Sequence, residues 1–456
     1  MFQDTDNILH GKKHIHFIGI GGSGMCPLAQ ILHTKGYYLT GSDNNETDTL
    51  RLVKSLGIPV FMGQRAENIQ GADLIVHTAA IMADNPELIA AKNSGVPVLE
   101  RSELLGLITK QYSNAVCVSG THGKTTTSSM LTQILLDAGI DPTAVIGGKL
   151  KKINGYGIVG NSETMVCEAC EFVDTFLKLY PDVSVILNID NDHLDYFKTV
   201  DNTIKSFKKF CDNTTKCIIV NGDDSNSMKA VEGQNKPVIT FGLSETNDYS
   251  ARNIVHHGGI EKTFDVYKKD EKLVTITLNV PGDHNVMNAL AACVAALIVG
   301  VSPEQLVKPL AEFCGAGRRF EILGKINGVT IADDYAHHPT ELKATLEAAK
   351  SLGFKRVWAV FQPFTYSRTV EHFDDFVKTL SIADRVVLSE IMGSREKNTY
   401  NIYSKDLVEK IDGCVWFNTF EEIKDYVLAN AEPGDLVITL GCGDIYKAAK
   451  LMLNIK

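Results

Sequence analysis

The sequence predicts an α/β protein built from three domains. Short apolar runs alternate with helical segments along most of the chain, which is typical of parallel sheets covered by helices. Two of these runs end in a glycine-rich turn that leads into a helix. With 456 residues, the chain is long enough for several separate hydrophobic cores.

A Rossmann-like first domain is expected over residues 1–110. Its apolar runs are residues 14–20, 71–81 and 96–105, and helical stretches lie between them. In "HFIGIGGSGM", Gly19, Gly21 and Gly24 have the G-x-G-x-x-G spacing of a dinucleotide-binding turn, and Asp43 follows at the distance of the acidic residue that binds a ribose. The residues alone therefore leave open whether the ligand is a nicotinamide cofactor.

A P-loop ATPase-like central domain is expected over residues 111–316. It begins with a strand-to-helix segment at 114–139, and further buried strands are expected at 164–170, 183–189 and 216–222. Residues 249–282 alternate between apolar and polar side chains as a hairpin does, which predicts a small antiparallel patch on this domain. The helix at 285–299 is expected to close it.

The α/β alternation then resumes and predicts a Rossmann-like C-terminal domain over residues 317–456. Its expected strands lie within residues 329–335, 356–363, 384–391 and 435–443, each followed by a helical segment.

Composition excludes some classes of function. The net charge is -10 and no basic block could neutralise a nucleic-acid backbone, so no nucleic-acid partner is expected. No signal core or membrane-length apolar stretch is present, which predicts no membrane insertion and a cytoplasmic location. Most of the ten cysteines lie in apolar runs and are expected to be reduced. Cys167 and Cys170 form one C-x-x-C without a second pair, and their role stays open.

The most informative stretch is "GTHGKTTT", residues 120–127. Its glycines let backbone N–H groups turn toward phosphate oxygens at a helix N-terminus. Lys124 is expected to reach the β- and γ-phosphates of a nucleotide, and Thr125 to present its hydroxyl to Mg²⁺. The glycines are closer together than in the common P-loop, so the motif is a shortened variant.

Acidic residues at two strand ends are candidate Mg²⁺ ligands. The strand ends of an α/β sheet next to a P-loop are where ligands bind. For each single residue, a solvated loop position remains an equal alternative. The candidates are Glu168, Glu171, Asp190, Asp192, His193 and Asp195.

Eight segments in order resemble the Mur ligases of peptidoglycan synthesis, from about residue 14 to the C-terminus. They are "HFIGIGGSGM", "GTHGKTTT", "EACE", "NIDNDHLD", "GDHNVMNALAA", "GRRFE", "DDYAHHPTE" and "FQPFTYSRT". The resemblance implies an ATP-dependent amide ligase that joins L-alanine to the lactyl carboxylate of UDP-N-acetylmuramate through an acyl phosphate. Its first glycine turn then holds the UDP moiety and not a nicotinamide cofactor, whereas a dehydrogenase would leave the P-loop unexplained.

The same resemblance implies roles for individual residues. Catalysis is assigned to Lys124, Glu168, His193, Arg319 and Asp334, and Mg²⁺ binding to Thr125, Glu168 and His193. ATP binding is assigned to Gly120, Thr121, His122, Gly123, Lys124, Thr125, Thr126, Asn285, Asn288, Arg319 and Asp334. Binding of the UDP substrate is assigned to Gly19, Gly21, Gly22, Ser23, Gly24, Met25, Ser42 and Asp43. Binding of L-alanine is assigned to Tyr335, His337 and Arg368. The contributions of the neighbouring Arg318, Asp333 and His338 are not separated.

Several alternatives stay open at this stage. His193 can also be interpreted as a loop histidine, the two asparagines as polar surface, and Arg368 as a surface partner of Glu371 or Asp374. Phe364 and Thr365 stand where many relatives have a His-Arg pair, and Lys198 receives no role. The competing functions are a related ligase that adds another amino acid or a peptide, and a nucleotide-binding switch. We expect a monomer or weak homodimer.

Overall fold

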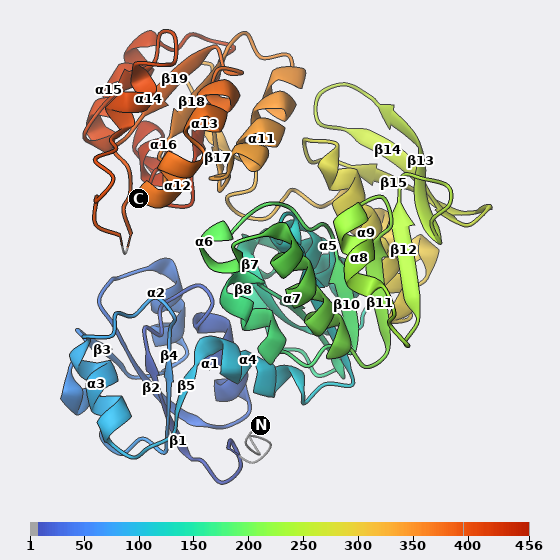
Figure 1. Ribbon diagram of the computed structural model, residues 1–456, viewed down its shortest axis with the longest axis vertical. Helices are drawn as coiled ribbons and strands as arrows, with labels where there is room; N and C mark the ends of the chain where they lie inside the picture. Colours follow the sequence, from blue (N-terminus) through green and yellow to red (C-terminus); the bar gives the residue numbers. More distant parts are fainter. Residues whose placement is uncertain (1–7, 395, 456) are drawn as a thin grey trace. The chain divides into compact units, whose positions relative to one another are not determined.

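The computed structural model describes residues 8–394 and 396–455, apart from the side chains of Leu194 and Asp195. The chain has the predicted α/β architecture, with three sheets that follow one another along the sequence (Figure 1). It divides into two compact units. One contains Met1–Asn253, Phe264–Ile276 and Met287–Ala311, and the other contains Ile254–Thr263, Thr277–Val286 and Glu312–Lys456. The predicted domain boundaries near residues 110 and 317 stay a prediction.

The first sheet is entirely parallel and has the strand order β3-β2-β1-β4-β5. Its strands are β1 (His14–Ile18), β2 (Tyr38–Asp43), β3 (Val60–Met62), β4 (Leu74–His77) and β5 (Val98–Glu100). The connecting helices are α1 (Cys26–Thr34), α2 (Asp48–Ser55), η2 (Ala66–Ile69) and α3 (Pro86–Asn93), and α4 (Arg101–Thr109) follows β5. Ile18 of β1 pairs with both Ser42 and His77, so the turn after β1 lies at the carboxyl edge of the sheet.

The second sheet has ten strands in the order β15-β14-β13-β12-β11-β10-β6-β9-β7-β8. The strands are β6 (Asn114–Ser119), β7 (Thr143–Leu150), β8 (Gly155–Ile158), β9 (Thr164–Glu168), β10 (Val183–Ile186), β11 (Cys217–Asn221), β12 (Val238–Gly242), β13 (Tyr249–His256), β14 (Lys262–Lys268) and β15 (Glu271–Leu278). The prediction of a small patch over residues 249–282 is therefore corrected. Strands β13, β14 and β15 continue the central sheet because β13 hydrogen-bonds to β12.

Helices of this region connect the central strands. They are α5 (Lys124–Asp137), η3 (Lys151–Ile153), η4 (Phe172–Lys178), α6 (Leu194–Phe197), α7 (Val200–Asp212), α8 (Ser225–Val231), α9 (His284–Ile298), η5 (Pro303–Leu306) and α10 (Val307–Ala311). One continuous apolar core includes buried side chains of both the first and the second sheet regions, such as Leu28, Leu105, Cys117 and Phe176. A Cβ atom on Gly157 of β8 would lie 2.7 Å from Pro27 Cβ of α1, so these two elements pack closely.

The third sheet has the order β16-β17-β21-β18-β19-β20. Its strands are β16 (Glu321–Ile326), β17 (Val329–Asp334), β18 (Val357–Phe361), β19 (Arg385–Leu388), β20 (Val415–Trp416) and β21 (Leu436–Leu440). The helices are α11 (Pro339–Ser351), α12 (Tyr366–Glu371), α13 (Phe373–Leu380), α14 (Ser404–Val408), α15 (Phe420–Asn430) and α16 (Tyr446–Met452). Leu440 pairs with both Asp334 and Phe361, so three strands end side by side. No helix in the described ranges is long and apolar enough to cross a membrane.

Candidate active site

The glycine turn of the first sheet is held by its own neighbours. Gly19 has a left-handed φ of 81°, which favours glycine, and its N–H donates to Ser42 O over 2.8 Å. The N–H of Gly21 donates to Asp43 Oδ2 over 2.9 Å, while Asp43 Oδ1 accepts from the N–H groups of Asn44 and Asn45. Both oxygens of Asp43 are thus engaged by backbone groups of the turn and its own loop.

Ser42 connects this turn to a buried polar network. Its hydroxyl donates to Glu87 Oε2 over 2.7 Å, and the other oxygen of Glu87 lies 2.7 Å from His16 Nε2. His16 and Glu87 are both fully buried. The second ring nitrogen of His16 lies 2.7 Å from Thr40 Oγ1, so every polar group of the network has a partner.

The two residues before Met25 leave their backbone donors available. Within the ranges that the structure describes, the N–H groups of Ser23 and Gly24 donate to no other residue. They stand just before α1, where the helix dipole also favours negative charge. The turn therefore offers free donors to an anion at residues 23 and 24.

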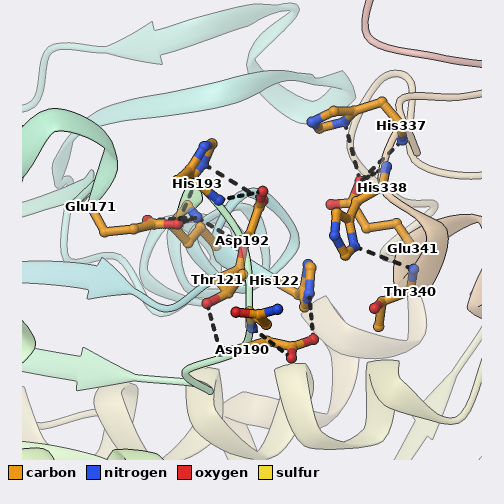
Figure 2. Close-up of polar contacts among 12 residues, drawn as sticks. Thr121, His122, Glu171, Asp190, Asp192, His193, His337, His338, Thr340 and Glu341 are labelled. Atoms are coloured by element: carbon orange, nitrogen blue, oxygen red, sulfur yellow. Dashed lines mark hydrogen bonds and ion pairs between the residues drawn. The ribbon is translucent and has the colours of Figure 1, made fainter. Parts of the chain in front are cut away.

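The P-loop of the second sheet lies between β6 and α5. Gly120 and Gly123 have φ values of 135° and 90°. A Cβ atom on Gly120 would lie 2.9 Å from Leu187 Cβ, so the turn requires glycine there for close approach as well. The Thr121 hydroxyl accepts the N–H of Asp190 over 2.9 Å, and His122 Nε2 lies 3.2 Å from Asp190 Oδ2 (Figure 2). These contacts fix the loop after β10 against the P-loop.

Lys124 is the first residue of α5 and points back across the P-loop. Its Nζ donates to Gly120 O over 2.5 Å and to Thr121 O over 3.0 Å. The same Nζ lies 2.9 Å from Glu171 Oε2, and Glu171 is only 2% exposed. Burial acts to lower the pKa of Lys124, but Glu171, Cys170 and Glu168 together outweigh it and the pKa is raised. The lysine therefore stays charged at the position where phosphate would bind.

Glu168 ends β9 beside the start of α5. Its carboxylate accepts hydrogen bonds from Thr125 Oγ1 over 3.2 Å and from Ser128 Oγ over 3.1 Å. The hydroxyl of Thr125 and the carboxylate of Glu168 are oxygen donors of the kind that Mg²⁺ prefers. Mg²⁺ keeps several waters and needs few protein ligands, so this pair fits the ion. No group of three or more His, Cys, Asp or Glu side chains suited to a metal occurs in the described part of the chain.

His193 lies near Glu171, the acid that pairs with Lys124. Its Nε2 is 4.0 Å from Glu171 Oε1 and 3.6 Å from Asp192 Oδ2 (Figure 2). Its backbone has a left-handed φ of 57°, which is uncommon for a residue other than glycine and is often found at functional sites. Asp195, another candidate ligand, has a side chain outside the described part of the structure.

The two asparagines at the start of α9 have different surroundings. Asn288 Oδ1 accepts a hydrogen bond from Thr127 Oγ1 over 3.4 Å, and its amide packs against Gly123 of the P-loop. Asn285 donates through Nδ2 to Pro281 O over 2.7 Å. Only Asn288 is thus shown against the phosphate-binding turn.

Two arginines organise the carboxyl edge of the third sheet. Arg318 Nε donates to Asp333 Oδ2 over 2.8 Å and its Nη2 to Gly441 O over 2.6 Å. The guanidinium groups of Arg318 and Arg319 lie 5.0 Å and 5.2 Å from the centre of the Tyr335 ring, within the range of cation–π attraction. Arg319 Nη1 also lies 3.9 Å from Glu341 Oε1.

Asp334 is enclosed by backbone groups of the same edge. One oxygen accepts the N–H of Phe320 and the other that of Ala336, each over 2.7 Å. Burial raises the pKa of Asp334 to about 6, although the positive charge of Arg319 and these hydrogen bonds act to lower it. The carboxylate therefore shapes the loop that presents Tyr335, in addition to the ATP contact that the sequence predicted for it.

The three residues predicted to bind L-alanine follow β17 and β18, the two strands on either side of β21. The rings of Tyr335 and His337 lie 5.6 Å apart, and His337 Nδ1 is 3.2 Å from Glu341 Oε2 (Figure 2). Arg368 lies in α12, after the end of β18. Burial raises the pKa of the Cys442 thiol to about 12, and the positive charge of Arg368 opposes this, so the arginine lies near the end of β21.

Some contacts had no signal in the sequence. The C-x-x-C spacing suggested a relation between Cys167 and Cys170, but Cys167 Sγ instead lies 3.4 Å from Cys117 Sγ on the adjacent strand. The pairing of Glu171 with Lys124 and the bridging position of Arg318 also depend on strands that are distant in sequence. Only knowledge of which strands are neighbours would have revealed these three contacts.

Comparisons with known proteins agree with this arrangement. Three family models match successive parts of the chain: "Mur ligase family, catalytic domain" at residues 14–113, "Mur ligase middle domain" at 118–296, and "Mur ligase, glutamate ligase domain" at 318–443. UDP-N-acetylmuramate–L-alanine ligase of Clostridium novyi is 45% identical over 98% of both chains. The solved UDP-N-acetylmuramate-alanine ligase of Thermotoga maritima covers 97% of this chain and 98% of its own, with 27% identity and a TM-score of 0.83. A murein peptide ligase from Psychrobacter arcticus has the same coverage, with 26% identity and a TM-score of 0.75.

Proposed function

The chain belongs to the Mur ligase family, and from this premise we infer that it joins L-alanine to UDP-N-acetylmuramate with consumption of ATP. The product is an amide of the lactyl carboxylate, formed in peptidoglycan precursor synthesis. A single observation carries the assignment to the site. Lys124 is held, charged and largely buried, across the glycine turn after β6, beside Glu168 and Glu171 at the end of the neighbouring strand β9.

We propose that the P-loop binds the phosphates of ATP. Lys124 Nζ now contacts two P-loop carbonyls and Glu171, and a γ-phosphate would offer it stronger acceptors. Asn288 at Gly123 supports a nucleotide contact from α9. The assignments of His122, Thr126, Asn285, Arg319 and Asp334 to ATP rest on the family pattern.

We propose Mg²⁺ as the metal, held by Thr125 and Glu168, with His193 as a third ligand. The hydrogen bond between the Thr125 hydroxyl and Glu168 supports the first pair, because the same two oxygens face each other without a long rearrangement. When bound, Mg²⁺ would neutralise charge on the phosphate oxygens. His193 faces Glu171 and Asp192, so its part in this site is the least supported by geometry.

We propose that the first glycine turn binds the UDP moiety. The unoccupied N–H groups of Ser23 and Gly24 support a pyrophosphate at the start of α1. Asp43 and Ser42 then act on the turn and not on the ligand, because Asp43 accepts three backbone donors and the Ser42 hydroxyl donates to Glu87. This engagement also leaves Asp43 without the free carboxylate that a nicotinamide dinucleotide requires for its ribose.

We propose that Arg368 binds the carboxylate of L-alanine, with Tyr335 and His337 beside it. The free amino acid carries one fixed negative charge, and a planar guanidinium binds it through two parallel hydrogen bonds. The side-by-side ends of β17, β21 and β18 support this convergence.

The chemistry proceeds in two steps. A lactyl carboxylate oxygen attacks the γ-phosphorus of ATP, the bond to the bridging oxygen breaks, and ADP leaves an acyl phosphate behind. The amine nitrogen of L-alanine then attacks the acyl carbon, inorganic phosphate leaves and the nitrogen loses a proton. Lys124 stabilises the charge that develops on the transferred phosphoryl group.

Two further features are proposed. A cytoplasmic location is supported by the ten cysteines, which are all free thiols, as expected in a reducing compartment. A monomer or weak homodimer is our expectation for the assembly.

An assay of ADP release that omits one substrate at a time tests the function. ADP should appear only when UDP-N-acetylmuramate, L-alanine and ATP are all present. Replacing L-alanine with the tripeptide of a murein peptide ligase reaction tests the related activity. Full-rate ADP release without a UDP-sugar, or faster release with the peptide, would overturn the proposed function.

A further inference from the structure

Arg101 is a cation beside the first glycine turn that no part of the proposed mechanism uses. It is the first residue of α4 and is half-buried. A Cβ atom on Gly24 would lie 3.1 Å from Arg101 Cδ, 3.4 Å from Nε and 3.5 Å from Nη1. The guanidinium therefore lies directly against the turn, and glycine at position 24 permits this approach.

Burial acts to raise the pKa of the Glu100 carboxyl, and the charge of the adjacent Arg101 is one of several interactions that lower it. Within the described residues the guanidinium of Arg101 forms no hydrogen bond or ion pair. The adjacent acid Glu100 is engaged elsewhere, because it accepts from Ser102 Oγ over 2.6 Å and lies 3.9 Å from Lys178 Nζ. A partly buried arginine that makes no direct hydrogen bond or ion pair in the described residues, next to free backbone donors, is suited to an anionic ligand.

The charges of Arg101 and Lys124 act on one common neighbour. Burial raises the pKa of the Cys170 thiol, while the positive charges of Lys124 and Arg101 act in the opposite direction. Both cations are therefore close enough to act on one thiol of the same compact unit. A UDP-sugar bound at residues 19–24 has to bring its carboxylate to the γ-phosphate at Lys124, and Arg101 would act on the charge of the same ligand.

We propose that Arg101 binds the pyrophosphate of the UDP-sugar, together with the N–H groups of Ser23 and Gly24. This inference rests on the proposed function of the glycine turn and adds to it a side-chain cation that lies against the turn. The planar guanidinium of Arg101 provides two parallel N–H donors, and the oxygens of a diphosphate can accept both hydrogen bonds.

The test measures ligand binding to the full-length protein without ATP. UDP is titrated by calorimetry and uridine is followed by ligand-detected NMR, for the wild type and the variants Arg101→Ala and Arg101→Lys. Arg101→Ala should weaken UDP binding about tenfold or more and leave uridine binding within about twofold, because only UDP carries the diphosphate. The UDP affinity of Arg101→Lys should lie between those of the wild type and Arg101→Ala, since lysine keeps the charge and loses the planar pair of N–H donors.

Lys92→Ala is the matched control, because Lys92 is an exposed cation in the last turn of α3 in the same region. It should leave both affinities unchanged. The Michaelis constant for UDP-N-acetylmuramate should rise in Arg101→Ala, with the constant for ATP unchanged. Suppose that the wild type binds UDP more tightly than uridine. The assignment of Arg101 is then overturned if Arg101→Ala binds UDP with the same advantage over uridine, or if its affinities for UDP and uridine fall by the same factor. If the wild type itself does not bind UDP, the proposed function of the turn fails instead.

Discussion

The two glycine turns of this protein have the same local design and different surroundings. Each follows a buried parallel strand, contains at least one glycine with a left-handed φ, and leads into a helix. In the first turn, a carboxylate, Asp43, binds the backbone and no lysine lies within the turn. In the second, a lysine, Lys124, lies inside the turn and a carboxylate, Glu171, binds the lysine.

This difference suits the first turn to ligand binding and the second turn to the chemical step. A turn that offers backbone donors can hold a phosphate group whose charge does not change during the reaction. A turn with a buried lysine and nearby metal-type oxygen donors can stabilise a phosphoryl group whose charge does change. The first turn is therefore expected to affect affinity for the UDP-sugar, and the second to affect turnover.

The strongest test of this separation is Lys124→Ala. We expect nearly complete loss of turnover, because the lost charge contact should cost at least about 2 kcal/mol of transition-state stabilisation. UDP binding, measured by calorimetry, should be unchanged. The control Lys229→Ala removes an exposed cation from α8 and should keep full activity. A Lys124→Ala enzyme with more than about a tenth of the wild-type rate would contradict its role.

The next effect is expected for Glu168→Gln. Loss of one carboxylate ligand should raise the Mg²⁺ concentration needed for half-maximal ADP release about tenfold or more. His193→Ala, measured in the same titration, tests the less supported ligand. Glu163→Gln is the control, because Glu163 is an exposed acid just before β9, at the other end of the same strand. If Glu168→Gln needs the same Mg²⁺ concentration as the wild type, Glu168 is not a metal ligand and its role is structural.

A third variant extends the comparison to the third sheet, whose carboxyl edge has Arg318 and Arg319. Arg368→Lys keeps the charge and loses the two-pronged geometry, so the Michaelis constant for L-alanine should rise about tenfold. The constants for ATP and the UDP-sugar should change little. Arg385→Lys, at the exposed start of β19, is the control. If the constant for L-alanine does not change, Arg368 does not belong to the amino-acid site.

The smallest effect is expected at Asp43. Asp43→Asn keeps one acceptor for the N–H of Gly21 and loses the charge, so the affinity for UDP should fall only about threefold to fivefold. Turnover at saturating substrate should stay within about twofold. Asp43→Ala should be somewhat weaker in binding than Asp43→Asn. Complete loss of UDP binding in Asp43→Asn would mean that the carboxylate contacts the ligand itself.

Much of the fold could be predicted because its signals are local. The apolar runs at residues 164–170, 183–189 and 216–222 contain β9, β10 and β11, and the helix after "GTHG" begins at Lys124. Runs of this length between turn residues indicate buried strands without knowledge of their neighbours. The strands β13, β14 and β15 were expected only as a small antiparallel patch on the second domain, because nothing in their alternation tells which strand they pair with.

The sequence by itself determined the strand–turn–helix units, the two glycine turns and the order of the motifs that places the chain among the Mur ligases. The tertiary structure decided which charged side chains contact the two turns. Glu171 pairs with Lys124, Asp43 accepts the N–H of Gly21, and Arg101 lies against Gly24. Conformation within a turn depends on its own few residues, so glycine and the helix start can be recognised directly. Contacts across a sheet edge depend on strand order and register, which are set by the packing of crossover helices over the whole core and are not encoded at any single position.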